Sequence, residues 1–331
     1  MRTEMDIVYA SDGGFAKVAG VSLLSLLLAH KDVNILIHFL DAGLSDESKS
    51  ELEKIVLENS SSAHICFYDV KNCIEAIKDN IPAMGSSYAT YARLFIERLL
   101  PENIEKCLYI DCDTFIAGSV SEIFEDTDVF PLYMAYDLVP QFHKRDIGLD
   151  FDAPYFNAGV CLFNLRRWRE CNATQKVLDL LQSKVTFRFH DQDILNILFK
   201  GQIGLLDLRF NVMSQNIYFG SSWHCRWLYG MNREKFYSSK TYKKALKNPV
   251  IYHLTSVPFL VRPWIYHSNH PVRSLYDDLK NSNKWLANFT VYKEFSRRQI
   301  ILQKICAGAP KVFSAFLFTV LHKIFYKRES I

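Results

Sequence analysis

Short apolar runs alternate with longer amphipathic stretches along the first part of the chain. The short runs are apolar throughout, which is typical of strands buried on both faces of a sheet. The longer stretches carry apolar residues at three-to-four spacing, which predicts helices. Strands that alternate with helices predict an α/β domain with a mostly parallel central sheet flanked by helices. The predicted strands are residues 6–11, 34–41, 64–70 and a run from residue 106, and the predicted helices are residues 15–30, 45–59 (with Ser45 as N-cap) and 87–100.

The second half of the chain has a less regular pattern. It predicts a strand at residues 155–165, a helix from residue 166, a capped helix at residues 190–201 and a strand at residues 204–211. From about residue 271 the alternation stops, and the remaining chain is helical, aromatic and basic in pattern. We therefore predict a domain at residues 1–270 and a helical, basic C-terminal extension at residues 271–331.

Aspartates mark the ends of several predicted strands. Ligands of open α/β sheets bind outside the carboxyl ends of the strands, so these aspartates are candidate binding residues. The turn after the first strand reads ASDGG, which is not the G-x-G-x-x-G fingerprint of dinucleotide-binding enzymes. The aspartates are Asp12, Asp41, Asp69, Asp111 and Asp113.

Two aspartates separated by one residue recur along the chain, at positions 111/113, 126/128, 150/152 and 191/193. Asp111 and Asp113 follow the buried run KCLYI, where side-chain alternation would place both carboxylates on one face. Neighbouring carboxylates repel each other unless a positive charge lies between them, and hard divalent cations take carboxylate ligands. The pairs at 126 and 150 lie in polar connections, and Asp191 is a plausible helix N-cap. We therefore predict a metal role for Asp111 and Asp113.

Composition narrows the class of protein. The net charge of +3 does not favour a nucleic-acid partner. The eight cysteines form no C-x-x-C pair, which disfavours a zinc site, and their scatter fits a reducing compartment. We find no signal-peptide pattern and no run of about 20 apolar residues that could span a bilayer, so we expect a cytoplasmic protein.

Taken together, several segments in order resemble glycosyltransferase family 8, which includes retaining galactosyl- and glucosyltransferases of bacterial surface polysaccharides and the glycogenins. The resemblance extends over roughly residues 5–264. The segments that carry it are IVYASD, FLDAGLS, SYATYARLFI, CLYIDCDTFIAGSVSEIF, YFNAGVCLFNLRRWR, HDQDILNILFKG, LRFNVM and HLTSVPFLVRPW.

The resemblance implies a GT-A type fold, a UDP-hexose donor and a divalent metal, usually Mn²⁺ with Mg²⁺ as the alternative. It implies metal ligation by Asp111, Asp113 and His253. Gln192 and Asp191 match the pair beside the transferred sugar and are our candidate catalytic residues. The full set implied to bind the donor is Ala10, Ser11, Asp12, Arg93, Asp111, Cys112, Asp113, Asn157, Ala158, Asp191, Gln192, His253 and Arg262.

Two segments depart from the family pattern. Gly13 and Gly14 stand where the family often has an asparagine or lysine, so we expect a donor contact of the family to be lost there. The stretch from His253 to Arg262 is longer than the usual H-x-x-G-x-x-K-P-W, lacks its glycine, and has arginine in place of lysine. Either cation could neutralise phosphate.

The family implies retention of the anomeric configuration, by one of two mechanisms. A double displacement needs a nucleophile, for which Gln192 is the candidate, although an amide oxygen is a poor one. Front-face attack by the acceptor needs none, and we prefer it. The rival classes are a metal-dependent phosphatase or nucleotidyltransferase on a similar sheet, and an inactive scaffold. The choice between galactose and glucose stays open.

The C-terminal extension predicts membrane association. Residues 311–328 join a dense apolar run to lysines and arginines, as in helices that lie in the headgroup region of an anionic leaflet. The family's acceptors are commonly lipid-carried saccharides, so we predict peripheral association with the cytoplasmic face of the inner membrane, in lipopolysaccharide, O-antigen or capsule assembly. The alternative is a helix packed on the catalytic domain or on a second subunit.

Overall fold

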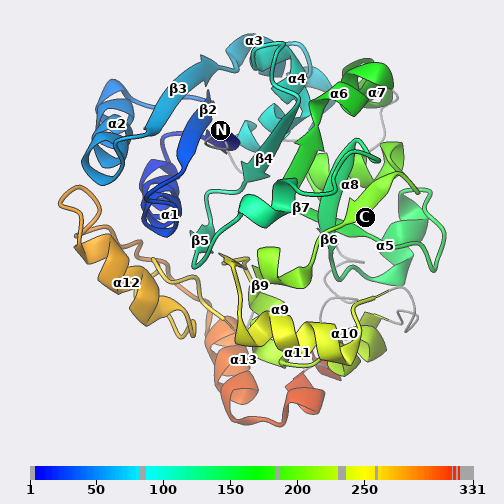
Figure 1. Cartoon of the computed structure of the whole chain (residues 1–331). Helices are drawn as coiled ribbons and strands as arrows, with labels where there is room; N and C mark the ends of the chain where they lie inside the picture. The colour runs from blue at the N-terminus through cyan, green and yellow to red at the C-terminus, as the bar shows by residue number, and fades with distance from the viewer. Residues whose placement is uncertain are drawn as a thin grey trace.

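The structure, a computed structural model, describes residues 4–81, 87–182, 187–229, 236–257, 260–314, 316, 317 and 320. Its centre is a seven-stranded sheet in the order β3-β2-β1-β4-β7-β6-β8 (Figure 1). β7 runs antiparallel to both its neighbours, β4 and β6, and the other pairings are parallel. The predicted mostly parallel sheet is therefore confirmed. Its strands are β1 (Glu4–Ser11), β2 (Asn34–Asp41), β3 (Ala63–Asp69), β4 (Lys106–Ile110), β6 (Leu132–Tyr136), β7 (Phe156–Asn164) and β8 (Ile203–Leu205).

Helices cover both faces of this sheet because its inner strands are apolar on both sides. Ile7 and the next residue, Val8, point to opposite faces and belong to two separate hydrophobic cores. The Ile7 core includes α1 (Ala16–Ala29), α2 (Asp46–Asn59) and α12 (Arg273–Asn281). The Val8 core includes the 3-10 helix η2 (Ala89–Phe95), α4 (Ile96–Leu99), α6 (Leu165–Glu170), α7 (Ala173–Gln182) and α8 (His190–Leu198).

A second, smaller sheet joins distant parts of the chain in the order β5-β10-β9. It consists of β5 (Thr114–Ile116), β10 (Ile251–His253) and β9 (Val212–Met213). β5 starts directly after the turn that follows β4, so the two sheets meet at residues 111–113. The remaining helices are α3 (Lys71–Glu75), η1 (Lys78–Asn80), η3 (Ser121–Phe124), α5 (Gln141–Asp146), η4 (Leu208–Phe210), α9 (Ser214–Phe219), α10 (Ser222–Tyr229), α11 (Ser239–Lys247) and α13 (Arg297–Gly308).

Several of the expected elements differ from those in the described part of the chain. The expected helix at 87–100 is a 3-10 helix followed by one α-helical turn, and the expected strand at 204–211 ends at Leu205 because Asp207 caps the 3-10 turn η4. The helix expected from residue 166 is divided into α6 and α7 at Asn172, whose φ of 52° lies in the left-handed region. Asp191 does not cap α8, since the N-cap residue is Phe189 and no side chain caps the helix. By contrast, the Ser45 cap is confirmed by its acceptance of the Ser48 N–H.

The chain beyond residue 270 packs at first on the domain built around the central sheet. Leu286 is fully buried in the Ile7 core, and a Cβ added at Gly20 of α1 would lie 2.9 Å from Trp285 and 3.0 Å from Leu286. Glycine at position 20 therefore permits this close packing. The domain boundary at residue 270 remains a prediction. The chain after this residue stays packed against the core as far as Leu286.

Helix α13 has one buried side and one exposed side. Its Cys306 is buried beside α9, where the Tyr218 hydroxyl donates to the Cys306 carbonyl at 2.8 Å, whereas Ile300, Ile301 and Ile305 are exposed. Most of the predicted membrane segment at 311–328 lies outside the described residues. Within the described part of the chain, no helix combines the length and apolarity needed to cross a membrane.

Candidate active site

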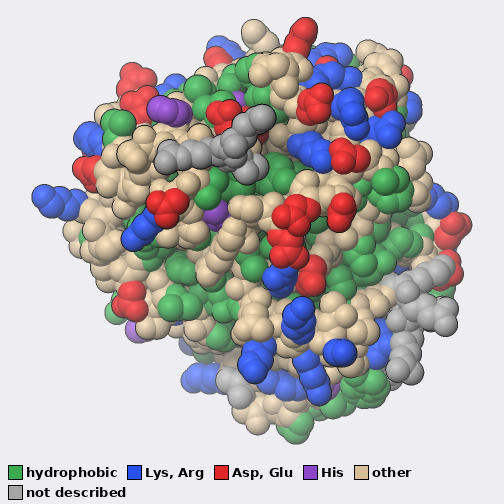
Figure 2. Space-filling view, in the orientation of Figure 1, with side chains coloured by type: hydrophobic (Ala, Val, Ile, Leu, Met, Phe, Trp, Pro, Cys, Tyr) green, Lys and Arg blue, Asp and Glu red, His purple; other side chains and the backbone are tan. Residues whose placement is uncertain are grey.

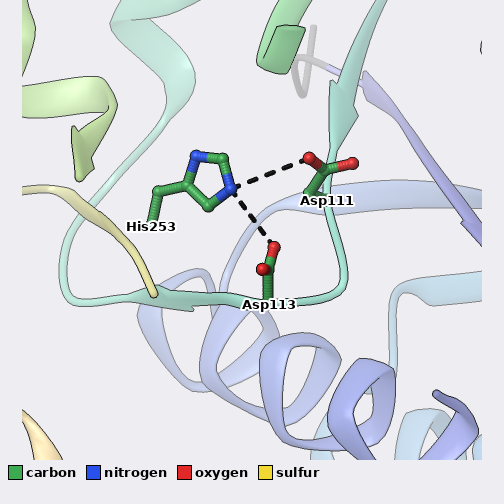
Figure 3. Close-up of side chains that lie close together, drawn as sticks. All are labelled: Asp111, Asp113 and His253. Carbon is green, nitrogen blue, oxygen red and sulfur yellow. Dashed lines mark ion pairs between the residues drawn. The ribbon is translucent and has the colours of Figure 1, made fainter. Parts of the chain in front are cut away.

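Asp111, Asp113 and His253 converge where the two sheets meet (Figure 3). The β5–β10 pairing places His253 opposite Thr114, the residue after Asp113. The Nε2 atom of His253 lies 3.2 Å from Oδ1 of Asp113 and 3.7 Å from Oδ2 of Asp111. The predicted reason for this proximity was wrong, because Asp111 and Asp113 lie in the turn after β4 and strand alternation does not apply there. The turn and the pairing with β10 bring the groups together instead.

The donor set fits a divalent cation. Two carboxylates and one imidazole offer oxygen and nitrogen ligands, and their ligand atoms lie within 4.8 Å of one another. The other ring nitrogen of His253, Nδ1, lies 3.0 Å from Oδ1 of buried Asn211, and such a partner commonly orients a metal-binding histidine. Gly159 makes room for the imidazole, since a Cβ there would lie 2.1 Å from Cε1 of His253.

Electrostatics favours a cation at this position. Burial opposes ionisation of Asp113, yet the charges of His253 and Arg262 lower its pKa to about 2. Burial likewise opposes the charged imidazole, yet Asp113 raises the pKa of His253. The carboxylates thus stabilise positive charge at a buried site, and they would stabilise a bound metal ion in the same way.

Arg93 links this cluster to α8. Its Nη2 lies 2.7 Å from Asp111 and its Nε lies 2.9 Å from Asp191, while Nη1 donates to the Ala158 carbonyl. The guanidinium also lies 4.1 Å from the ring centre of Tyr109. Arg93 is buried, so it is not an arginine of the helix surface. Burial raises the pKa of Asp191 to about 7, although Arg93 opposes that shift.

Gln192 has a fully engaged amide. Its Oε1 accepts from the Ala158 N–H at 3.0 Å and from Asn157 Nδ2 at 3.1 Å. Its Nε2 donates to Oδ2 of Asp137 at 3.1 Å and to the Tyr155 hydroxyl at 3.3 Å. Both lone pairs and both hydrogens are therefore occupied.

Arg262 lies on the segment after His253 and pairs with the metal-site carboxylate. Its Nη2 lies 2.7 Å from Oδ2 of Asp113, and its Nε donates to the Leu254 carbonyl at 3.1 Å. The rings of Trp264 and Phe15 flank the guanidinium. The positive charge therefore lies directly beside the cluster, despite the longer segment that leads to it.

The predicted nucleotide side lies at the ends of β1 to β3. The Cys112 thiol donates to the Ala10 carbonyl at 3.2 Å, which ties the turn after β4 to the end of β1, and the neighbouring Ser11 hydroxyl donates to the Asp12 carbonyl at 2.8 Å. Asp12 lines a cavity of about 350 Å³ together with Asp41, Asp69 and Tyr88, among other residues.

Three residues of the site were not selected from the sequence. Asp137 follows β6 and accepts from both Asn157 and Gln192. The apolar run LYMAY was not predicted as a strand, and predicting it would have brought Asp137 under the strand-end criterion applied to β1 and β4. Asn211 and Gly159 lie inside segments that carry the family resemblance, LRFNVM and FNAG. Their importance comes from contacts with His253, which the sequence does not reveal.

The comparison with protein families decides the class. The model described as "Glycosyl transferase family 8" matches residues 6–266. The chain belongs to glycosyltransferase family 8. That membership confirms the predicted resemblance and favours sugar transfer over the phosphatase and nucleotidyltransferase alternatives.

Similar proteins agree with this family 8 assignment. A Haemophilus influenzae protein, whose name assigns it only provisionally to the glycosyltransferases, is 33% identical over 62% of this chain. The match spans 63% of that protein, which is less than two thirds of its length. The lipopolysaccharide 1,3-galactosyltransferase of Salmonella typhimurium is 24% identical over 85% of this chain and 79% of its own length. The crystal structure of galactosyltransferase LgtC with donor and acceptor sugar analogues has a TM-score of 0.69 at 28% identity, covering 85% of this chain and 96% of that one. This likeness agrees with the predicted GT-A type fold.

Proposed function

We propose that this family 8 enzyme transfers a hexosyl group, galactose or glucose, from UDP to a saccharide acceptor with retention of configuration, in lipopolysaccharide or related surface-polysaccharide assembly. The observation that carries the proposal is the convergence of Asp111, Asp113 and His253. The similar proteins include the lipopolysaccharide 1,3-galactosyltransferase and a lipopolysaccharide 1,2-glucosyltransferase of Escherichia coli. They support a hexose donor without choosing between the two sugars.

Asp111, Asp113 and His253 would hold the metal. A divalent ion bound there supplies Lewis-acid stabilisation of the departing diphosphate. The imidazole ligand favours Mn²⁺ over Mg²⁺, which prefers oxygen ligands. Arg262, already paired with Asp113, would add positive charge next to the diphosphate.

The remaining donor contacts divide between the two ends of the site. At the nucleotide end, we assign Ala10, Ser11, Asp12 and Cys112 to the uridine moiety. At the sugar end, we assign Arg93, Asn157, Ala158, Asp191 and Gln192 to the hexose. Arg93 supports this assignment because it joins Asp111 of the metal cluster to Asp191 of α8.

The hydrogen bonds of Gln192 support front-face transfer. A nucleophile needs a free lone pair, and both lone pairs of Oε1 are occupied by Ala158 and Asn157. In front-face transfer the acceptor hydroxyl attacks on the side of the leaving group, and the departing phosphate takes its proton. Gln192 would then position the sugar.

Gln192→Ala is therefore expected to keep measurable activity with retained configuration, at about 10- to 100-fold lower kcat, because misplacement of the sugar costs of this order. The product anomer, read by NMR, and steady-state kinetics test this. A covalent glycosyl adduct on Gln192 would overturn the front-face mechanism. Gln175→Ala, on the exposed part of α7, is the matched control and should leave the rate unchanged.

The proposed acceptor is carried on lipid, and the lower end of the molecule supports membrane contact. Lysine and arginine side chains gather there, where α10, α11 and α13 lie (Figures 1 and 2). The exposed Ile300, Ile301 and Ile305 of α13 and exposed Trp223 of α10 are apolar. Basic and apolar side chains on one surface suit the headgroup region of an anionic leaflet. Packing on the fold has support as well, since Cys306 and Ser314 are buried and the Lys311 ammonium lies 3.7 Å from the ring centre of Tyr218.

The double variant Ile301→Glu/Ile305→Glu is expected to lose at least about tenfold in affinity for vesicles that contain anionic lipid, because each glutamate replaces apolar contact with like charge. Hydrolysis of UDP-sugar should stay unchanged. Cosedimentation measures the affinity, and Leu57→Glu, at an exposed position of α2, is the control. Equal vesicle binding by the double variant would refute membrane contact through α13.

Release of UDP from UDP-galactose and UDP-glucose, measured without acceptor and with Mn²⁺, tests the proposed function. We expect slow release from at least one donor and none in chelator. A phosphatase would release inorganic phosphate instead, and an inactive scaffold would release neither product.

A further inference from the structure

A buried chain of side-chain amides joins the metal cluster to the sugar end of the site. Nδ1 of His253 lies 3.0 Å from Oδ1 of Asn211, and Nδ2 of Asn211 donates to Oδ1 of Asn157 at 2.9 Å. Nδ2 of Asn157 donates in turn to Oε1 of Gln192 and, at 3.0 Å, to Oδ2 of Asp137. Asn211 is the one link between His253 and Asn157 in this chain of bonds, and its side chain is fully buried.

Backbone N–H groups fix the direction of every bond in this chain. The Gly159 N–H donates to Oδ1 of Asn157 at 3.0 Å, and a backbone N–H can only donate, so that atom must be oxygen. Asn211 must therefore present its NH₂ group to Asn157 and its oxygen to His253. An oxygen only accepts, so Nδ1 of His253 carries a hydrogen and donates it. The same logic applies at Gln192, whose oxygen faces the Ala158 N–H.

We infer that Asn211 is a positioning residue that sets the metal-binding form of His253 and the orientation of the sugar-facing amides together. The inference rests on the proposed function, and it adds a residue outside the sets assigned above to the metal and the donor. With the hydrogen on Nδ1, Nε2 is the ring nitrogen left to bind a metal, and it lies beside Asp111 and Asp113. With its NH₂ group on Asn157, Asn211 also keeps Asn157 turned toward Gln192 and Asp137.

Two substitutions of similar shape separate these two tasks. Asn211→Asp retains an acceptor for His253 but places an oxygen against Oδ1 of Asn157, which cannot turn without losing the Gly159 N–H. Asn211→Leu removes both bonds. The aspartate should therefore disturb only the sugar end, and the leucine should disturb both ends.

Mn²⁺ affinity of the protein without donor, measured by electron paramagnetic resonance, reads the metal end. For Asn211→Leu we expect about 10- to 100-fold weaker Mn²⁺ binding, the range typical of lost partners of metal-binding histidines. For Asn211→Asp we expect Mn²⁺ affinity at least equal to wild type, with kcat for UDP-sugar hydrolysis lowered by at least about tenfold at an unchanged KM for Mn²⁺.

Asn164→Leu is the matched control, because Asn164 is also buried but bonds to Arg167 and Thr127 at the opposite end of β7 from Gly159. It should lower stability without changing Mn²⁺ affinity. Wild-type Mn²⁺ affinity in Asn211→Leu, or wild-type kcat in Asn211→Asp, overturns the inference. If Asn211→Leu does not fold, the split between kcat and Mn²⁺ affinity in Asn211→Asp decides alone. A wild-type protein that binds no Mn²⁺ overturns the proposed metal site and the inference with it.

Discussion

Asp113→Asn is expected to lower the rate of UDP release by about 10³-fold. Metal stabilisation of a departing charged group is worth several kcal/mol, and each 1.36 kcal/mol is a factor of ten in rate. Asp113 contributes Oδ1 toward His253 and Oδ2 toward Arg262, so the neutral amide weakens both the metal site and the hold on the guanidinium. Steady-state kinetics with saturating Mn²⁺ measures the effect.

Asp150→Asn is the control for that experiment. Asp150 also belongs to a pair of aspartates separated by one residue, but it is exposed and bonds to Lys200 on the surface. We expect its rate to stay close to that of the wild type. A rate for Asp113→Asn within tenfold of wild type, in a folded protein, would contradict the assignment of Asp113 to the metal.

Gly159→Ala is expected to lower activity at least about 100-fold, since an error of about 1 Å in placing a catalytic group has this effect. The new Cβ would lie 2.1 Å from Cε1 of His253 and 2.8 Å from Oδ2 of Asp111. Gly159 is fixed in β7, and its carbonyl accepts from the Asp111 N–H at 2.7 Å. The imidazole must therefore move out of the cluster. Mn²⁺ binding and UDP release should fall together, at a stability cost of about 1–3 kcal/mol.

Gly118→Ala provides the comparison for Gly159→Ala, because a Cβ there meets nothing closer than 3.8 Å. It should fold and act like the wild type. Normal Mn²⁺ affinity in Gly159→Ala would show that His253 does not need its present position, and the proposed metal geometry would then be wrong.

Local chemistry made the central strands predictable. The inner strands, such as β4 and β7, are buried on both faces, so each reads as a mostly apolar run, and residues 34–41 coincide with β2 as observed. Ser45 was predictable as a cap because a serine followed by acidic residues satisfies the free N–H groups of a helix start. The expected strand at 204–211 failed because the turn at Asp207 interrupts an otherwise apolar run.

The site was predictable only in part, because its key contacts join distant residues. His253 reaches Asp113 through the pairing of β10 with β5, which no local pattern announces, and the family resemblance alone pointed to it. The burial of Arg93 between Asp111 and Asp191 is likewise a tertiary effect. Asn211 shows the limit most clearly, since its role depends on the direction of hydrogen bonds that only the folded chain defines.

Calorimetric titration of UDP into the protein tests the central claim most directly, because it needs neither the correct hexose nor the acceptor. The account predicts that UDP binds in the presence of Mn²⁺, and that binding is lost in chelator and in His253→Ala. Equally tight UDP binding with and without Mn²⁺ would contradict the claim that Asp111, Asp113 and His253 hold a metal that engages the diphosphate.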